Sequence, residues 1–319
     1  KNYGIPLDEE AIKRAEFYRP DADSDEMQYL QSHRQQLGGF LPERKVSCAK
    51  LKTPELSAFK TFLEGTGKRQ ISTTMAMVRM LGQLMKDAEI GKFVVPIVPD
   101  EARTFGMDGL FEIAGIYSSE GQKYTPVDVD SLMSYREATD GQILQEGICE
   151  SGAIASFLAA GTAYAVHGVP TIPFYIFYSM FGFQRVGDMI WSCADMMCRG
   201  FLLGGTAGRT TLNGEGLQHE DGHSHVLATT VPNLKSYDPA FSYELAVIIR
   251  DGIYRMYEQQ ENIFYYLTLY NENYVMPRMP DNAACAEGII KGAYCWRRSD
   301  CDDEPVHLLA SGSIMQQAI

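Results

Sequence analysis

Short runs of apolar residues alternate along this chain with longer segments in which apolar positions recur every three or four residues. The runs predict buried strands, and the longer spacing predicts amphipathic helices. Strands are predicted over residues 93–100, 141–147, 171–179, 201–206, 234–239 and 262–270. Helices are predicted over residues 21–36, 72–86, 149–166, 183–199 and 241–259, with Ser72 as a cap. Because apolar strands alternate with helices, we expect an α/β fold, a mostly parallel sheet with helices on both faces.

The same pattern divides the chain into three parts. We expect residues 1–44 to be a helix and linker from a preceding domain, 45–280 an α/β domain, and 281–319 the incomplete start of a further α/β domain. The last stretch, VHLLASGSIMQQAI (306–319), predicts a strand, a turn and a barely begun helix. A strand–helix unit that ends there would leave its strand without a complete cover of helices. At the other end, the chain begins at Lys1 without Met. We therefore expect a fragment of a longer protein.

Residues 151–184 contain no Asp, Glu, Lys or Arg, which raises the question of a membrane span. Gly168, Pro170 and Pro173 interrupt this stretch, so neither half offers the roughly 20 apolar residues that a span needs. A buried helix followed by a buried strand fits better, and there is no signal peptide. We expect no membrane insertion.

Composition narrows the class of protein further. The 319 residues are 45% hydrophobic and 22% charged, as in an ordinary globular protein. With 28 basic and 41 acidic residues the net charge is −13, which argues against a nucleic-acid or anionic-membrane surface. Seven scattered cysteines without a C-x-x-C pair favour neither structural zinc nor a disulfide framework. We therefore expect a reducing compartment, the cytoplasm.

Two short motifs match known zinc-binding and phosphate-binding signatures, but the residues around them do not favour either kind of site. HEDGH (219–223) matches the H-E-x-x-H of zinc proteases, which needs a helix, yet Gly214, Gly216 and Gly222 punctuate the stretch. Three interpretations stay open: a zinc hydrolase, a loop that hydrogen-bonds to itself, and an active-site loop without metal. GTGKRQ (65–70) is not a phosphate-binding loop, because Phe62 and Arg69 replace the required residues.

In a parallel α/β sheet, ligands bind beyond the carboxyl ends of the strands. Polar residues follow several predicted strands there: Asp100, Glu101, Glu146, Glu150, Tyr178, Ser179 and the loop 209–225.

Several long stretches together resemble one family. They are DEARTFGMDGLF (100–111), GQILQEGICESGA (141–153), IPFYIFYSMFGFQRVGD (172–188) and GRTTLNGEGLQHEDGHSH (208–225), with further similarity over 237–247 and 271–280. They are similar to the homodimeric, bacterial-type pyruvate dehydrogenases, the thiamine-diphosphate-dependent decarboxylating components of the pyruvate dehydrogenase complex. The resemblance implies that 45–280 is the pyrimidine-binding domain of a transketolase-like fold, and that 281–319 begins the C-terminal domain.

The resemblance also implies a site. Glu150 matches the glutamate that hydrogen-bonds to a pyrimidine ring nitrogen of the cofactor, and Phe181 matches the ring that stacks on the pyrimidine. The implied neighbours are Ile148 and Met180, which line the cofactor, and Asp100, Glu101, Tyr178 and His219, which lie near its thiazolium ring and the substrate. The implied cofactors are thiamine diphosphate and Mg²⁺, with the Mg²⁺ ligands in an N-terminal domain. The implied partners are a second copy, pyruvate and the lipoyl-bearing acetyltransferase.

Simpler interpretations compete for each residue. Glu150 alone is a first-turn helix residue favoured by the helix dipole, and Phe181 alone is a core residue. His223 and His225 are expected to structure their loop. For Cys149 the two interpretations are a reactive thiol and a buried, inert one, and we expect the second. For the whole protein the alternatives are a decarboxylase for another 2-oxo acid, a zinc hydrolase, and an assembly module without catalysis.

Overall fold

The computed structural model describes residues 4–36, 47–99, 102–131, 133–209, 212, 216–298 and 306–319. The chain separates into two compact units, Lys1–Arg44 and Lys45–Ile319. The predicted linker 37–44 lies outside the described residues.

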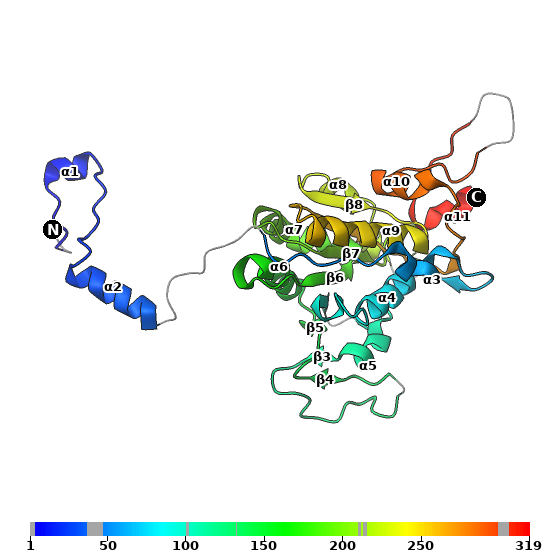
Figure 1. Cartoon of the computed structure of the whole chain (residues 1–319), viewed down its shortest axis with the longest axis horizontal. Helices are drawn as coiled ribbons and strands as arrows, with labels where there is room; N and C mark the ends of the chain where they lie inside the picture. Colours follow the sequence, from blue (N-terminus) through cyan, green and yellow to red (C-terminus); the bar gives the residue numbers. More distant parts are fainter. Residues whose placement is uncertain are drawn as a thin grey trace. The chain divides into compact units, whose positions relative to one another are not determined.

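The first unit contains two helices, α1 (Glu9–Lys13) and α2 (Asp25–Gln36) (Figure 1). The predicted helix ending near Gln36 is thus confirmed. Its first turn carries Asp25 and Glu26, where the helix dipole favours negative charge. No residue of α2 is buried.

The second unit is built on a six-stranded parallel sheet in the order β5-β2-β6-β7-β9-β8 (Figure 1). Its strands are β2 (Val94–Val98), β5 (Leu144–Gln145), β6 (Ile172–Tyr178), β7 (Phe201–Gly205), β8 (Leu234–Tyr237) and β9 (Phe264–Thr268). All six lie within predicted strands, which confirms the parallel α/β fold.

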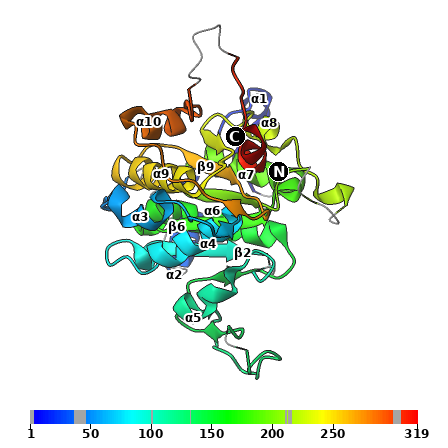
Figure 2. The same cartoon turned by 90° about the vertical axis from the view of Figure 1, so that its right-hand side faces the viewer.

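Helices cover both faces of this sheet, so its strands are apolar on both sides. On one face, Phe174 of β6 stacks on Phe201 of β7 at 4.6 Å between ring centroids, and Gly252 of α9 (Ser242–Ile253) lies against Phe201. On the other face, Phe177 packs against α7 (Ser179–Asp195) and Tyr175 against α6 (Glu150–His167). The covering helix α4 (Thr73–Leu84) packs beside α9 (Figure 2).

Two helix starts can be compared with the prediction, and the second of them bears on the site. Ser72 caps α4 as predicted, because its side chain accepts a hydrogen bond from the backbone N–H of Met75 at 3.0 Å. Helix α7 begins at Ser179, four residues before the predicted start, directly after β6. This early start places Met180 and Phe181 in the first turn of α7, at the carboxyl end of the sheet.

The remaining elements are short or peripheral. They are η1 (Leu56–Phe59), α3 (Lys60–Leu63), β1 (Gln70–Ile71), η2 (Gly91–Phe93), η3 (Met107–Leu110), α5 (Phe111–Ala114), β3 (Ile116–Tyr117), β4 (Glu137–Ala138), η4 (Leu217–His219), α8 (Ser224–Ala228), η5 (Tyr254–Glu258), β10 (Tyr274–Val275), α10 (Ala283–Lys291), η6 (Gly312–Ile314) and α11 (Met315–Ala318). The segment η5 is a π-helix that extends α9 to nearly the predicted end. The segment between β3 and β4 projects from the sheet at the bottom of Figures 1 and 2.

One predicted strand is wrong. Residues 306–311 have no regular structure, and Val306, Leu308 and Leu309 are exposed. A strand forms only where a neighbouring strand accepts its backbone hydrogen bonds, which an apolar sequence alone does not guarantee. Helix α10 packs on α9, with Cys285 and Ile289 buried in the main core. The domain boundary at residue 280 stays a prediction.

The uncharged stretch 151–184 forms most of α6, the whole of β6 and the first turn and a half of α7. A helix followed by a buried strand is therefore confirmed there. In the part of the chain that the structure describes, no helix is long and apolar enough to cross a membrane.

Candidate active site

The sheet has a topological switch point between β2 and β6. The chain leaves β2 for the edge strand β5 and then returns across β2 to β6, so the connections diverge from this pair. Such a point opens a crevice at the carboxyl ends of the two strands, where α/β proteins bind ligands. The predicted site residues Asp100 and Glu101 follow β2 in sequence, but they lie outside the described residues. Tyr178 ends β6 at this edge.

Three predicted site residues form one aromatic cluster at the end of β6. The ring of Tyr178 lies 5.8 Å from Phe181 and 4.9 Å from His219 between centroids, and Phe181 lies 5.2 Å from His219. Phe105 also packs against Tyr178, with 5.2 Å between the ring centroids. Among the described residues, no group hydrogen-bonds to the buried Nδ1 of His219. The fold thus brings the 217–219 turn onto the start of α7.

Glu150 joins this cluster through Arg185. It is the first residue of α6, and its Oε1 accepts a hydrogen bond from Nη1 of Arg185. The guanidinium of Arg185 also lies over the ring of Phe181, 4.0 Å from its centroid. The Glu150 side chain is 16% exposed and that of Arg185 is 49% exposed. One cation therefore contacts both the carboxylate and the aromatic face that the resemblance assigns to the cofactor.

Tyr175 contacts the backbone of Glu150. Its hydroxyl donates to the backbone carbonyl of Glu150 at 3.4 Å. Burial raises the pKa of Tyr175 well above its ordinary value, and the charges of Glu150 and Cys149 act in the same direction. Tyr175 therefore stays neutral, and its hydroxyl anchors the backbone at the start of α6.

Ile148 precedes Glu150 by two residues, and Met180 directly precedes Phe181. Ile148 is 79% exposed, and the Sδ of Met180 accepts a hydrogen bond from Gln184 at 3.4 Å. Cys149 is exposed and caps α6, since its Sγ accepts from the backbone N–H of Gly152 at 3.3 Å. The expectation of a buried thiol at this position was wrong, because the turn before α6 is open to solvent.

The HEDGH stretch does not form the helix that a zinc protease needs. His219 ends the 3₁₀ turn η4, the backbone is extended at Glu220, and His223 precedes α8. Asp221 organises the turn by accepting from the backbone N–H groups of His223 and Ser224 and from the Ser224 hydroxyl. Burial acts to raise the pKa of Asp221, but these hydrogen bonds outweigh it and lower the pKa.

The two later histidines have structural contacts. The Nε2 of His223 lies 3.0 Å from the side-chain nitrogen of Gln184 in α7. His225 bridges the ends of β8 and β9, with Nδ1 2.6 Å from the Ser236 hydroxyl and Nε2 3.0 Å from the Thr268 hydroxyl. Over the described ranges, no group of three or more His, Cys, Asp and Glu residues lies close enough to hold a metal ion.

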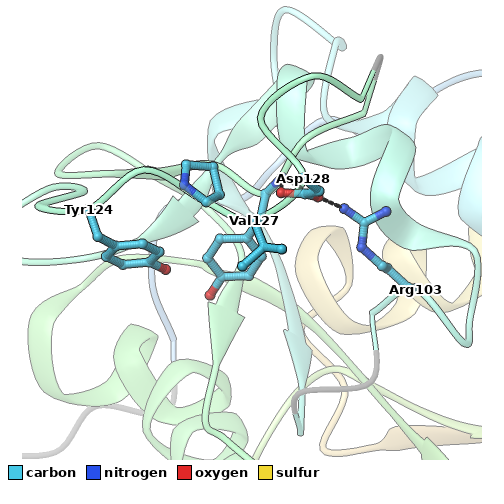
Figure 3. Close-up of a pocket in the computed structure, with 6 residues that line it drawn as sticks. Arg103, Tyr124, Val127 and Asp128 are labelled. Carbon is cyan, nitrogen blue, oxygen red and sulfur yellow. Dashed lines mark hydrogen bonds and ion pairs between the residues drawn. The ribbon is translucent and has the colours of Figure 1, made fainter.

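A separate depression of about 320 Å³ lies in the segment that follows β2 (Figure 3). Its lining residues are Arg103, Tyr124, Pro126, Val127, Asp128 and Tyr135. Arg103 is held there by an ion pair with Asp128 and lies over the ring of Phe111. None of the lining residues belongs to the cluster around Phe181, so this depression is not the candidate site.

Sequence reasoning missed Arg185. It is the first charged residue after the uncharged stretch 151–184, and it lies four positions after Phe181. On a helix that spacing places the two side chains on one face. The sequence analysis did not use this spacing, because it predicted that the helix begins at residue 183 and so placed Phe181 outside the helix.

A family model described as "Pyruvate dehydrogenase E1 component middle domain" matches residues 51–277. The chain belongs to this family.

Similar full-length proteins carry the name "Pyruvate dehydrogenase E1 component". The one from Pseudomonas aeruginosa is 55% identical over 316 residues, which cover 99% of this chain and 36% of that protein. The one from Escherichia coli (strain K12) is 52% identical over 316 residues, which cover 98% of this chain and 35% of that protein. The chain therefore spans about a third of the length of these curated relatives.

Solved structures show a transketolase-like fold. Transketolase from Leishmania mexicana superposes with a TM-score of 0.55 at 14% identity, covering 84% of this chain and 32% of that chain. A transketolase variant from Pichia stipitis superposes with a TM-score of 0.56 at 13% identity, covering 78% of this chain and 32% of that chain. At such identities the likeness concerns the fold alone.

Proposed function

We propose that this chain is the pyrimidine-binding part of a thiamine-diphosphate-dependent pyruvate dehydrogenase E1 component. The whole protein would decarboxylate pyruvate oxidatively and acetylate the lipoyl group of an acetyltransferase partner. The observation that carries the proposal is the linked arrangement of Glu150, Phe181, Tyr178 and His219 at the carboxyl edge of the sheet, in a member of this family.

The residues fit an aminopyrimidine ring. Arg185 illustrates the fit, because its flat, N–H-bearing group touches the carboxylate of Glu150 and the face of Phe181 at once. A flat heterocycle that offers a ring N–H would use the same kinds of contact, a hydrogen bond to the carboxylate and stacking on the aromatic ring. Tyr175 bonds to the backbone carbonyl of Glu150, which leaves the side-chain carboxylate as an acceptor.

Each residue then has a role of its own. Thiamine diphosphate, when bound, supplies an acidic thiazolium carbon and an electron sink. Glu150 would hold a proton at the pyrimidine nitrogen, Phe181 would stack on the ring, and Ile148 and Met180 would line its edge. Within the cluster, Tyr178 orients the ring of His219 by an edge-on contact.

His219 would exchange protons or donate a hydrogen bond near the substrate. Its ring is held by two aromatic neighbours, while Nδ1 has no partner among the described residues. An imidazole ring can donate or accept a hydrogen bond and can carry a proton, which suits this role. Asp100 and Glu101, which follow β2 at the switch point, are proposed to lie on the same side.

The remaining parts of the proposal concern the whole protein. We propose that the Mg²⁺ ligands lie in an N-terminal domain, as the family resemblance implies. We further propose a homodimer, an acetyltransferase partner and a cytoplasmic location, as the family resemblance implies.

The test uses the full-length protein that contains this sequence. We expect thiamine-diphosphate-dependent release of CO₂ from pyruvate and transfer of the acetyl group to a lipoyl domain. Assays with 2-oxobutanoate and 2-oxoglutarate in parallel separate pyruvate from other 2-oxo acids. Equal or faster turnover of one of these acids would replace the proposed substrate, and no turnover of any 2-oxo acid would refute the activity.

A further inference from the structure

The carboxylate of Asp221 is buried two residues after His219 in the chain, and the proposed chemistry gives it no role. Its side chain is only 3% exposed. It accepts hydrogen bonds from the backbone N–H groups of His223 at 3.1 Å and Ser224 at 3.0 Å, and from the Ser224 hydroxyl. Burying a charge is costly unless such partners surround it, so this position asks for a reason.

A chain of hydrogen bonds joins Asp221 to the central sheet. The hydroxyl of Tyr266, a fully buried residue of β9, donates to the Ser224 hydroxyl at 2.9 Å, and that hydroxyl donates to Asp221. Gly204 of β7 makes space for the Tyr266 hydroxyl, because a Cβ at this position would overlap it. Each hydroxyl thus donates toward the carboxylate, and the turn is attached to two strands of the sheet.

The same turn is held against α7. The side-chain amide N–H of Gln184 lies 3.0 Å from Nε2 of His223, the residue that follows Gly222. Burial acts to raise the pKa of Asp221, whereas its hydrogen bonds to Ser224 and His223 and the nearby hydroxyl of Ser179 lower the pKa. The buried Ser179 hydroxyl therefore lies beside the carboxylate, although outside hydrogen-bonding geometry. Ser179 is the first residue of α7.

The ring of His219 depends on this turn for its place. Tyr178 and Phe181 hold the ring by aromatic contacts, and no group among the described residues hydrogen-bonds to its Nδ1. Aromatic contacts are weaker and less directional than a hydrogen bond to a charged group. The backbone that carries His219 must therefore be fixed from elsewhere.

We propose that Asp221 is a positioning residue for His219. It fixes the turn that carries His219 against the end of β6 and the first turn of α7, which carry Tyr178 and Phe181. This inference rests on the proposed function, because it takes His219 as the residue that acts on the substrate.

The first test measures kcat for pyruvate in the full-length protein. Asp221→Asn has nearly the same shape and keeps one oxygen for the two backbone N–H groups, but its amide cannot accept a hydrogen bond from the Ser224 hydroxyl. We expect kcat to fall by about 10- to 100-fold, as a small displacement of a reacting group can cause. Circular dichroism checks that the variant is folded.

Asp251→Asn is the matched control. Asp251 of α9 is also mostly buried and accepts a hydrogen bond from a tyrosine hydroxyl, that of Tyr265 at 3.2 Å. It contacts no residue of the aromatic cluster, so its variant should keep the wild-type kcat.

A double variant separates positioning from a general loss of structure. In a His219→Ala background, Asp221→Asn should lower the residual turnover by less than about twofold, because a residue that acts through His219 has nothing left to position. A residue that only stabilises the fold would lower turnover equally in both backgrounds.

A second measurement needs no activity. Diethyl pyrocarbonate modifies accessible histidine rings, and mass spectrometry of the peptides gives the rate at each one. We expect His219 to react about fivefold faster in Asp221→Asn than in the wild type, the factor that one net hydrogen bond contributes to a local opening equilibrium. The Asp251→Asn control should react at the wild-type rate.

The outcomes separate the two proposals. A loss of kcat that vanishes in the His219→Ala background, with faster modification of His219, supports the positioning role. Wild-type kcat in Asp221→Asn, an equal loss in both backgrounds, or unchanged modification of His219 would overturn it and leave the proposed function intact. If the wild type turned over no 2-oxo acid, the proposed function would fall, and the rate of modification would still decide whether Asp221 holds the His219 ring.

Discussion

Glu150→Gln is the substitution that examines the proposed site most directly. It keeps the size of the side chain and one hydrogen-bonding oxygen but removes the negative charge. The fold should tolerate it, because Tyr175 donates to the backbone carbonyl of Glu150 and not to its side chain. The lost ion pair with Arg185 is half exposed on the arginine side and screened by solvent, so we expect a stability change of roughly 0–1 kcal/mol.

The chemical effect should be far larger. If the carboxylate holds a proton at the pyrimidine nitrogen, its removal takes away one acid–base partner, which typically contributes about 10²–10⁴-fold in rate. That range equals a barrier of about 3–5 kcal/mol. A large loss of rate with only a small loss of folding stability would show that Glu150 acts in the reaction and not in holding the fold.

The assay follows hydrogen–deuterium exchange at the thiazolium carbon of the bound cofactor by NMR in the full-length protein. Glu146→Gln is the matched control, because Glu146 has the same side chain in the same segment but accepts a hydrogen bond from Ser156 instead. We expect the control to exchange at nearly the wild-type rate. Wild-type exchange in Glu150→Gln would refute the role given to this carboxylate.

Three further predictions concern other residues. His219→Ala should lower the turnover of pyruvate by about 10²–10⁴-fold, whereas a zinc-selective chelator should leave the wild type active. If the His219→Ala variant turned over pyruvate at the wild-type rate, His219 would not belong to the site. Gly182→Ala should destabilise the protein by about 1–3 kcal/mol in denaturant unfolding, because the new methyl group would overlap the ring of Phe177. Gly187→Ala, in the same helix and facing open space, is its control and should be neutral or stabilising. Asp221→Ala should cost about 2–4 kcal/mol near neutral pH, because it removes a buried, charged hydrogen-bond acceptor. Since folding lowers the pKa of Asp221, its contribution is present above the unfolded value of about 3.9 and is lost as the pH falls through the folded value. The stability gap between wild type and Asp221→Ala should therefore narrow in acid, and a gap independent of pH would contradict the assignment.

The alternation of apolar runs with segments of helical periodicity was enough to predict the parallel sheet from the sequence. This succeeds because strands buried on both faces must be apolar throughout, and β6 and β7 are such strands. The long stretches that resemble the family likewise pointed to the site residues at the carboxyl ends of the sheet strands. The same reasoning failed at residues 306–311, where the apolar pattern is present but the described residues form no strand.

What the sequence alone determined is therefore the strands of the main sheet, the main helices between them, their order along the chain and the residue types near their ends. The tertiary structure decided which of those ends meet: Tyr178, Phe181 and His219 come together although the last is far along the chain. It also decided that the HEDGH stretch is a turn held by Asp221 and that Arg185 bridges Glu150 and Phe181. These facts depend on side-chain directions and on where α7 begins. Both are set by packing between segments remote in sequence, which no local pattern encodes.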